Sequence, residues 1–184
     1  EDRLRPLEEY ATRPLALRGG VLADPVGSGK TACVAGLRAT RPMPTLVVVP
    51  RRLLSLWADE FAAWAPAVPV AVLPGIVAYR KWAARADVPP DEVTVTSYAF
   101  LTNPRHAGAF VALGRWRRIV LDESHEVLTN LRHPRRPVRN TEAALRRLSR
   151  DADHRWAVSA TPFVRGYHGL MGTLQWVAGA GAAL

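Results

Sequence analysis

The sequence has little cysteine and little lysine, and it lacks a long apolar run. Its 184 residues include one cysteine, Cys33, which excludes a framework of intrachain disulfides and is typical of a reducing compartment. No signal peptide opens the chain, because Glu1 leads directly into mixed polar sequence. The longest uncharged stretch, residues 166–184, is broken by glycines and polar residues and is too short for a membrane-spanning helix. We therefore expect a soluble, intracellular protein of the cytoplasm, nucleoid or nucleus.

Positive charge is abundant, and nearly all of it is arginine. The chain has 25 Lys plus Arg against 16 Asp plus Glu, a formal net charge of +9, and its only lysines are Lys30 and Lys81. Arginine binds phosphates bidentately, so this charge is compatible with a polyanionic partner. An arginine-rich composition from a GC-rich genome explains it equally well. Charge alone therefore does not decide the function.

Hydrophobic residues make up 48% of the chain, which predicts one domain with a proper core over residues 1–184. Six short aliphatic runs have the length of buried strands. They are Gly20–Ala23, Thr45–Val49, Val68–Leu73, Glu92–Thr96, Arg118–Leu121 and Trp156–Ser159.

Segments with helical spacing lie between these runs. They are Thr31–Thr40, Arg51–Trp64, Ile76–Ala86 and Thr141–Arg150. In the second of them Leu53, Leu54, Trp57, Phe61 and Trp64 share one face, and in the first we expect Cys33 to be a small core residue. The alternation predicts a three-layer α/β/α sandwich with a mostly parallel central sheet. Ligands of such sheets bind at the carboxyl ends of the strands.

The strongest motif follows the first expected strand. It reads Leu-Ala-Asp-Pro-Val-Gly-Ser-Gly-Lys-Thr and ends where a helix begins. Backbone N–H groups in such a loop bind phosphate oxygens, and the helix dipole assists. Lys30 is placed to reach the β and γ phosphates, and Thr31 to bind magnesium through its hydroxyl. The predicted phosphate-binding residues are Asp24, Gly27, Ser28, Gly29, Lys30 and Thr31, and Asp24 stands where a Walker A motif usually has glycine.

Two carboxylates follow the fifth expected strand, in the sequence Asp-Glu-Ser-His. Asp122 would hold magnesium, directly or through water, and Glu123 would orient and deprotonate the attacking water. The alternative is a simple strand-to-helix cap. The sixth strand ends in Ser-Ala-Thr-Pro, where the hydroxyls of Ser159 and Thr161 are candidates for sensing the γ-phosphate.

Taken in order, these three motifs resemble motifs I, II and III of the superfamily 2 helicase-like ATPases. Residues 19–24, Gly-Gly-Val-Leu-Ala-Asp, are similar to the Gly-Gly-Ile-Leu-Ala-Asp of the Swi/Snf branch, which accounts for Asp24. Residues 45–61 are similar to its motif Ia and residues 93–98 to its motif Ib region. The resemblance covers almost the whole chain.

The resemblance implies the first RecA-like lobe of a nucleic-acid-dependent ATPase, with ATP and Mg²⁺ as cofactors. It divides the chain into a lead-in over residues 1–18 and a core over residues 19–178. The resemblance implies that His125, Ser159 and Thr161 couple the ATP state to nucleic acid, with duplex DNA favoured over RNA. For His125 a helix cap is the alternative. The implied nucleic-acid contacts are Arg51, Arg52, Thr96, Ser97 and Tyr98. For the two arginines a solvated helix start is the alternative.

This sequence departs from the family pattern in several respects, one of which is Ser28, where the remodellers commonly have leucine. Residues 4–8 read Leu-Arg-Pro-Leu-Glu where the family's adenine motif has Leu-Arg-Pro-Tyr-Gln, so Glu8 lacks the amide donor. A basic, proline-containing stretch, His133–Arg139, is expected to be an exposed loop. Nothing resembles the second RecA-like lobe, which supplies arginine fingers in the family. A second lobe is therefore expected in a longer chain or a partner.

Two functions of different classes remain open at this stage. The first is a motor lobe that binds and hydrolyses ATP while moving on nucleic acid. The second is a helicase-derived nucleotide-binding scaffold or interaction subunit with little activity of its own.

Overall fold

The computed structural model describes residues 19–86, 88–113, 116–128, 140–162, 164 and 166–179. Their strands form a single six-stranded sheet with the order β1-β6-β5-β2-β4-β3, and every neighbouring pair is parallel. The strands are β1 (Gly19–Leu22), β2 (Thr45–Val49), β3 (Val70–Leu73), β4 (Val93–Ser97), β5 (Arg118–Asp122) and β6 (His154–Val158). The expectation of a parallel α/β sheet is confirmed.

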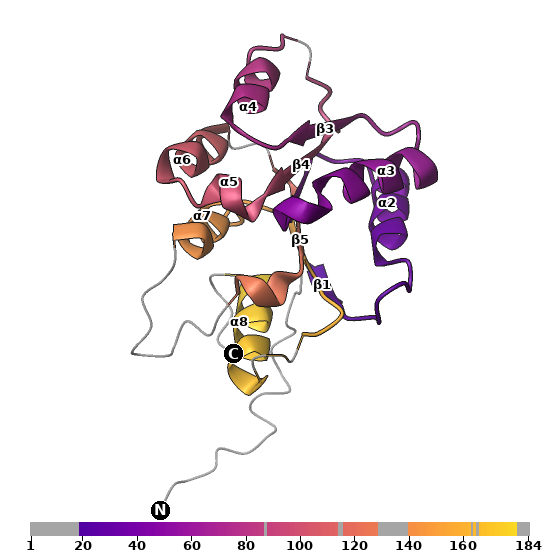
Figure 1. Cartoon of the computed structure of the whole chain (residues 1–184), viewed down its shortest axis with the longest axis vertical. Coiled ribbons are helices and arrows are strands. Elements are labelled where there is room, and N and C mark those ends of the chain that lie inside the picture. Colours follow the sequence, from indigo (N-terminus) through magenta and orange to yellow (C-terminus); the bar gives the residue numbers. More distant parts are fainter. Residues whose placement is uncertain are drawn as a thin grey trace, which may run out of the picture.

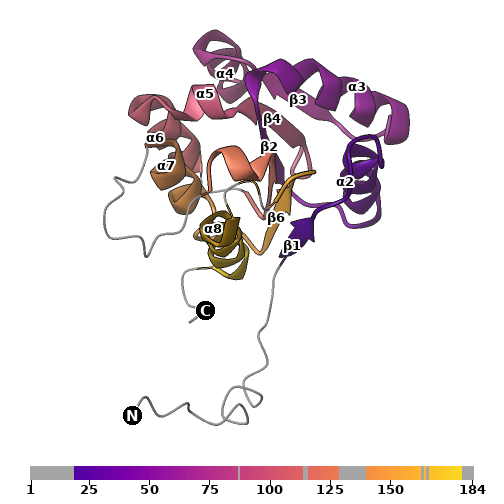
Figure 2. The same ribbon diagram turned by 60° about the horizontal axis from the view of Figure 1, so that its bottom comes forward.

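Seven α-helices within the described ranges cover the two faces of the sheet (Figures 1 and 2). Helices α2 and α3 pack on one face, and the remaining five pack on the other. The helices are α2 (Lys30–Thr40), α3 (Leu54–Trp64), α4 (Ile76–Ala83), α5 (Tyr98–Leu101), α6 (Pro104–Leu113), α7 (Asn140–Leu148) and α8 (Gly166–Ala178). Two 3₁₀ turns, η1 (Arg51–Leu53) and η2 (Ser124–Glu126), follow β2 and β5.

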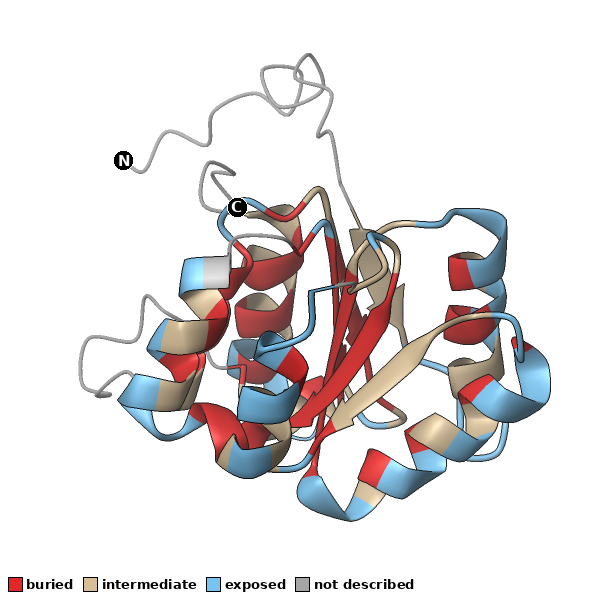
Figure 3. Ribbon diagram, turned by 90° about the horizontal axis from the view of Figure 1, so that it is seen from above, coloured by how far each residue is buried: buried red, intermediate tan, exposed pale blue. Residues whose placement is uncertain are grey.

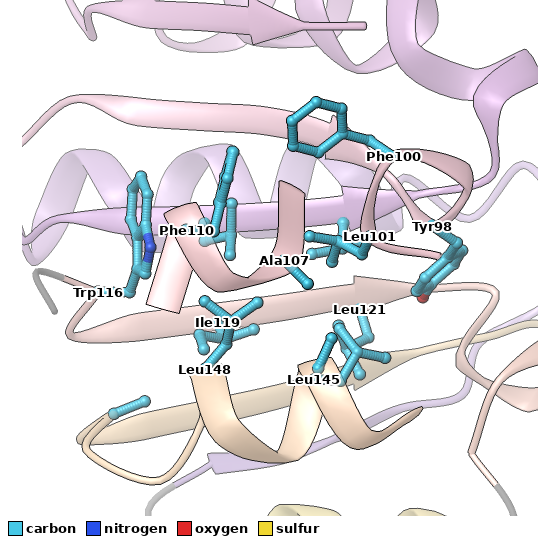
Figure 4. Close-up of a cluster of buried hydrophobic side chains, with 14 of the residues drawn as sticks. Tyr98, Phe100, Leu101, Ala107, Phe110, Trp116, Ile119, Leu121, Leu145 and Leu148 are labelled. Carbon is cyan, nitrogen blue, oxygen red and sulfur yellow. The ribbon is translucent and has the colours of Figure 1, made fainter. Parts of the chain in front are cut away.

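The central strands β2, β4 and β5 are buried throughout because helices cover both of their faces. All five residues of β2 are buried, and Figure 3 shows the sheet enclosed between the two helical layers. Side chains alternate between the faces with the period of a strand. Leu46 and Val48 join the core under α5, α6 and α7, whereas Val47 and Val49 join the core under α2 and α3. Figure 4 shows the core under α5, α6 and α7, in which Phe110 and Leu145 converge on Ile119 and Leu121 of β5.

The register aligns the carboxyl ends of the three strands that carry the motifs. Leu22 of β1 pairs with Val158 of β6, and Val158 pairs with Asp122 of β5. The backbone N–H of Ser159 also donates to Leu22 O at 3.1 Å. The loop after β1, the acidic pair at the end of β5 and the hydroxyl residues after β6 therefore meet at one edge of the sheet.

Two expectations about single residues are wrong. Trp64 is 65% exposed, because it is the last residue of α3 and Ala65 takes the buried place at the end of that helix. Cys33 is exposed, because α2 buries the adjacent face that carries Val34, Ala35 and Arg38.

The degenerate adenine motif at residues 4–8 and the basic stretch His133–Arg139 lie outside the described residues. Within the described ranges, no helix has both the length and the apolar character needed to cross a membrane.

Candidate functional site

The loop between β1 and α2 is exposed and is shaped by two glycines. Gly27 and Gly29 have φ angles of 81° and 83°, in the left-handed region that residues with a side chain rarely adopt. Gly29 is the N-cap of α2 and offers no side-chain cap to the first N–H groups of the helix. These N–H groups, at the positive end of an 11-residue helix, are ready donors for an anion.

Lys30 folds back over this loop. Its Nζ donates to the carbonyl oxygens of Asp24 at 2.8 Å and Pro25 at 2.6 Å. The ammonium group therefore stands above the loop that would hold the phosphates. Its charge also favours the ionised form of the Asp122 carboxyl at the end of β5.

Asp122 is 8% exposed and is held from three sides. Its Oδ2 accepts from Trp57 Nε1 at 2.7 Å, and its Oδ1 accepts from the N–H of Glu123 at 2.9 Å. Its backbone carbonyl accepts from the Tyr98 hydroxyl at 2.7 Å. Burial raises the pKa of the Asp122 carboxyl, while the bonds from Trp57 and Glu123 and the charges of Lys30 and Arg52 act in the opposite direction.

Glu123 has a backbone conformation that is unusual for its type. With φ of 50° and ψ of 43°, it is the only non-glycine among the described residues with a positive φ. Successive side chains of a strand point to opposite faces of the sheet, and this left-handed turn ends that alternation directly after Asp122. Strain of this kind persists where the surrounding structure requires it, most often at functional sites.

His125 connects the acidic pair with the end of β6. Its Nδ1 lies 2.7 Å from Ser159 Oγ, 3.5 Å from Thr161 Oγ1 and 3.4 Å from Glu123 Oε2. Ser159 Oγ also accepts from the N–H of Thr161 at 3.0 Å. A movement of the Glu123 side chain can therefore be transmitted through the imidazole ring of His125 to the segment after β6.

The residues expected to touch nucleic acid fall into two groups. Arg51 and Arg52 are exposed in η1, directly after β2, and Arg52 Nη2 pairs with Glu126 Oε1 at 3.1 Å. By contrast, the side chains of Thr96, Ser97 and Tyr98 are buried, and their hydroxyl groups bond to Leu73 O, Phe100 N and Asp122 O. The structure thus presents the two arginines to solvent and does not present these three hydroxyl groups.

Trp57 is the site residue that sequence reasoning missed. Its spacing in the amphipathic helix predicts a core position, and it is indeed fully buried. The pattern contains no sign that its N–H faces Asp122. The sequence signal for this contact is the alternation of side chains along β5. Asp122 lies on the same face of the strand as Val120, which packs under α2 and α3.

The donors at this edge suit magnesium bound together with phosphates. Mg²⁺ prefers oxygen ligands and is usually held by one or two carboxylates plus the phosphates of a nucleotide. Asp122 offers a carboxylate whose two oxygens each accept a single N–H from the described residues, and Thr31 follows Lys30 in the first turn of α2. Among the described residues, no three His, Cys, Asp or Glu side chains could hold a metal ion. A metal ion bound here would take its remaining ligands from the nucleotide and from water.

The sequence was compared with known proteins. Residues 10–179 match the family model of the SNF2-related domain. The chain is 29% identical to the mouse SWI/SNF-related matrix-associated actin-dependent regulator of chromatin subfamily A member 1, over 94% of this chain and 17% of that protein. It is also 29% identical to the ISWI chromatin-remodeling complex ATPase ISW2 of Saccharomyces cerevisiae, over 86% of this chain and 14% of that protein.

A third similar protein is the mouse DNA excision repair protein ERCC-6-like, which is 30% identical over 60% of this chain and 10% of its own length. The chain thus spans less than a fifth of each of these relatives. The family model nevertheless covers nearly the whole chain. The chain belongs to the SNF2-related domain family of helicase-like ATPases.

Proposed function

We propose that this chain is the ATP-binding and ATP-hydrolysing lobe of a translocase that acts on duplex DNA. The observation that carries the proposal is the convergence of three strand ends. The loop of Lys30, the pair Asp122 and Glu123, and the hydroxyl groups of Ser159 and Thr161 share one sheet edge.

Each of these groups has a role in the proposed reaction. The loop N–H groups and Lys30 would bind the phosphates, and Thr31 and Asp122 would hold a magnesium ion, which would supply positive charge against the phosphates. Glu123 orients a water molecule and takes its proton. His125, Ser159 and Thr161 report the state of the γ-phosphate to the rest of the chain.

DNA is the proposed partner for two reasons. The names of the similar proteins refer to chromatin and to DNA excision repair. The exposed Arg51 and Arg52 also stand at the carboxyl edge of the sheet, where they can hold backbone phosphates without reading bases.

The test compares three variants of the full-length gene product. We expect Lys30→Ala to lose nucleotide binding, because the main cation of the loop is removed. We expect Glu123→Gln to bind ATP but to lower kcat by about 100-fold or more, the contribution of a general base. Lys81→Ala is the matched control, because Lys81 is the only other lysine and is exposed on α4. ATPase rates with and without duplex DNA provide the measurement.

Normal turnover by Glu123→Gln would exclude its role as the base. Nucleotide binding without turnover or DNA stimulation in the unmodified protein would instead favour the scaffold function.

We also propose that full activity needs a second RecA-like lobe, because ATP in this family lies between two lobes. An arginine finger from that lobe contributes roughly 10³–10⁵-fold to the rate. Residues 1–184 alone should therefore bind Mg-ATP but hydrolyse it very slowly. Rapid turnover by this segment in a single-turnover assay would contradict the proposal.

A further inference from the structure

Trp57 is buried in the core between α3 and the sheet, yet it carries a polar group. Its side chain is 0% exposed, and its ring lies 6.2 Å from that of Phe61. A buried N–H without an acceptor is costly, so the indole requires a partner in this position. That partner is Asp122 Oδ2, at 2.7 Å.

This bond fixes the orientation of the Asp122 carboxylate. With Oδ1 held by the N–H of Glu123 at 2.9 Å and Oδ2 held by Trp57, the carboxylate has a donor on each oxygen. Rotation about the bond to the carboxyl carbon would break both contacts. Without Trp57, the contact from the adjacent backbone would be the only one left from the described residues, and the carboxylate could turn.

We propose that Trp57 is a positioning residue, which orients Asp122 for the magnesium–nucleotide complex. The inference rests on the proposed function, because it takes Asp122 as a magnesium ligand. Groups that hydrogen-bond to metal ligands fix their geometry, and their loss typically weakens metal binding about 10–100-fold.

A second tryptophan in the chain supplies a matched control. Trp82 is 4% exposed, and its Nε1 donates to Glu92 Oε1 at 2.5 Å. Glu92 is also buried and precedes β4, at the amino end of the sheet. The same indole-to-carboxylate bond therefore exists at the opposite end of the strands from Asp122.

The experiment replaces the N–H of Trp57 while keeping the shape of the ring. Benzothienylalanine, in which sulfur takes the place of the indole N–H, is introduced at position 57 in the full-length gene product, alongside Trp57→Phe. The readouts are the Mg²⁺ concentration for half-maximal binding of a directly excited fluorescent ADP, the ADP affinity in EDTA, and the melting temperature. We expect the Mg²⁺ requirement to rise about tenfold or more, with unchanged affinity in EDTA.

Trp82→Phe separates this effect from a general loss of packing. It should lower the melting temperature and leave the Mg²⁺ requirement unchanged. A purely structural role for Trp57 predicts that the two sites behave alike. The proposal is overturned if the benzothienylalanine protein needs no more Mg²⁺ than the unmodified protein.

Asp122→Asn distinguishes this failure from that of the proposed function. If Asp122→Asn abolishes the Mg²⁺ dependence and the Trp57 replacement does not change it, only the positioning role is lost. If Asp122→Asn also binds Mg-ADP normally, the assignment of Asp122 as a magnesium ligand is wrong, and the inference falls with it.

Discussion

Arg118 and Arg155 are both buried in strands, but their hydrogen bonds differ. Arg118, 1% exposed, donates from Nη2 to Arg41 O at 3.0 Å, while its Nε and Nη1 have no hydrogen-bond partner among the residues that the structure describes. Arg155, 8% exposed, donates to Ser149 O through both Nε and Nη2, at 2.9 and 2.6 Å. Burial and the positive charges of Arg38 and Arg41 lower the pKa of Arg118 to about 10.

The sign of this shift makes the charge of Arg118 unfavourable to folding. Below pH 10 the guanidinium is charged in both the folded and the unfolded chain, so the full cost is present at neutral pH. The free energy of unfolding rises only as the pH increases through the pKa of Arg118 in the folded chain, because the folded chain then releases the proton before the unfolded chain does. The two unpartnered donors add to the cost, at about 1–3 kcal/mol each.

We therefore predict that Arg118→Met raises the melting temperature at neutral pH by a few degrees, at roughly 2–4 °C per kcal/mol. Arg155→Met is the control: it removes the hydrogen bonds that Arg155 donates to the carbonyl oxygens of Ser149 and Arg150, and it should lower the melting temperature. Thermal unfolding followed by circular dichroism measures both. A similar loss of stability in the two variants would show that the Arg118 charge is compensated.

At the scale of elements, one ion pair joins the turns that follow β2 and β5. Arg52 in η1 and Glu126 in η2 are 63% and 39% exposed, with 3.1 Å between Nη2 and Oε1. Exposed pairs of this kind contribute only about 0–1 kcal/mol to stability. Their position is more informative, because η2 follows Asp122 and Glu123 directly. A DNA phosphate that binds Arg52 would compete with Glu126.

We predict that Glu126→Gln tightens binding to duplex DNA severalfold and leaves the melting temperature nearly unchanged. Removal of any negative charge could raise DNA affinity, so the decisive measurement is a double-mutant cycle with Arg52→Ala. In the Arg52→Ala background, Glu126→Gln should have little further effect. Equal gains in both backgrounds would show that Glu126 acts only through net charge. Fluorescence anisotropy with labelled duplex DNA gives the affinities.

The sequence predicts elements well where burial determines them. The six aliphatic runs became six strands, with boundaries that differ by a few residues at most, because strands covered on both faces must be apolar. Helices α5, α6 and α8 were not predicted. Helix α8 includes Gly166, Gly169 and Gly172, which disfavour helix in isolation, but it packs on β1 and β6. The packing of α8 on β1 and β6 therefore outweighs the low helix propensity of its glycines, which is the local signal in this segment.

At the scale of the whole molecule, the candidate site depends on contacts between distant segments. The loop of Lys30 and the pair Asp122 and Glu123 could be predicted, because each motif has its own sequence pattern. The bond from Trp57 to Asp122 joins residues 65 positions apart and is set by the packing of α3 on the sheet. The burial of Thr96 likewise follows from its pairing between β2 and β3. No pattern along the chain encodes such contacts, so the structure was needed to find them.

The net charge of +9 is compatible with two modes of DNA binding, one spread over the whole surface and one localised at the carboxyl edge of the sheet. Binding to B-DNA weakens with salt, with a slope of about −0.9 in log K against log salt per phosphate contacted. Arg51 and Arg52 lie at the carboxyl edge of the sheet, whereas Arg80 and Lys81 are exposed in the last turn of α4, toward the amino edge. Replacing either pair with alanine removes the same charge.

We predict that the Arg51/Arg52 variant loses affinity and flattens the slope by about 2, while the Arg80/Lys81 variant keeps the original slope. Equal flattening by both variants would mean that charge over the whole surface, rather than the edge that holds the candidate ATP site, binds the DNA.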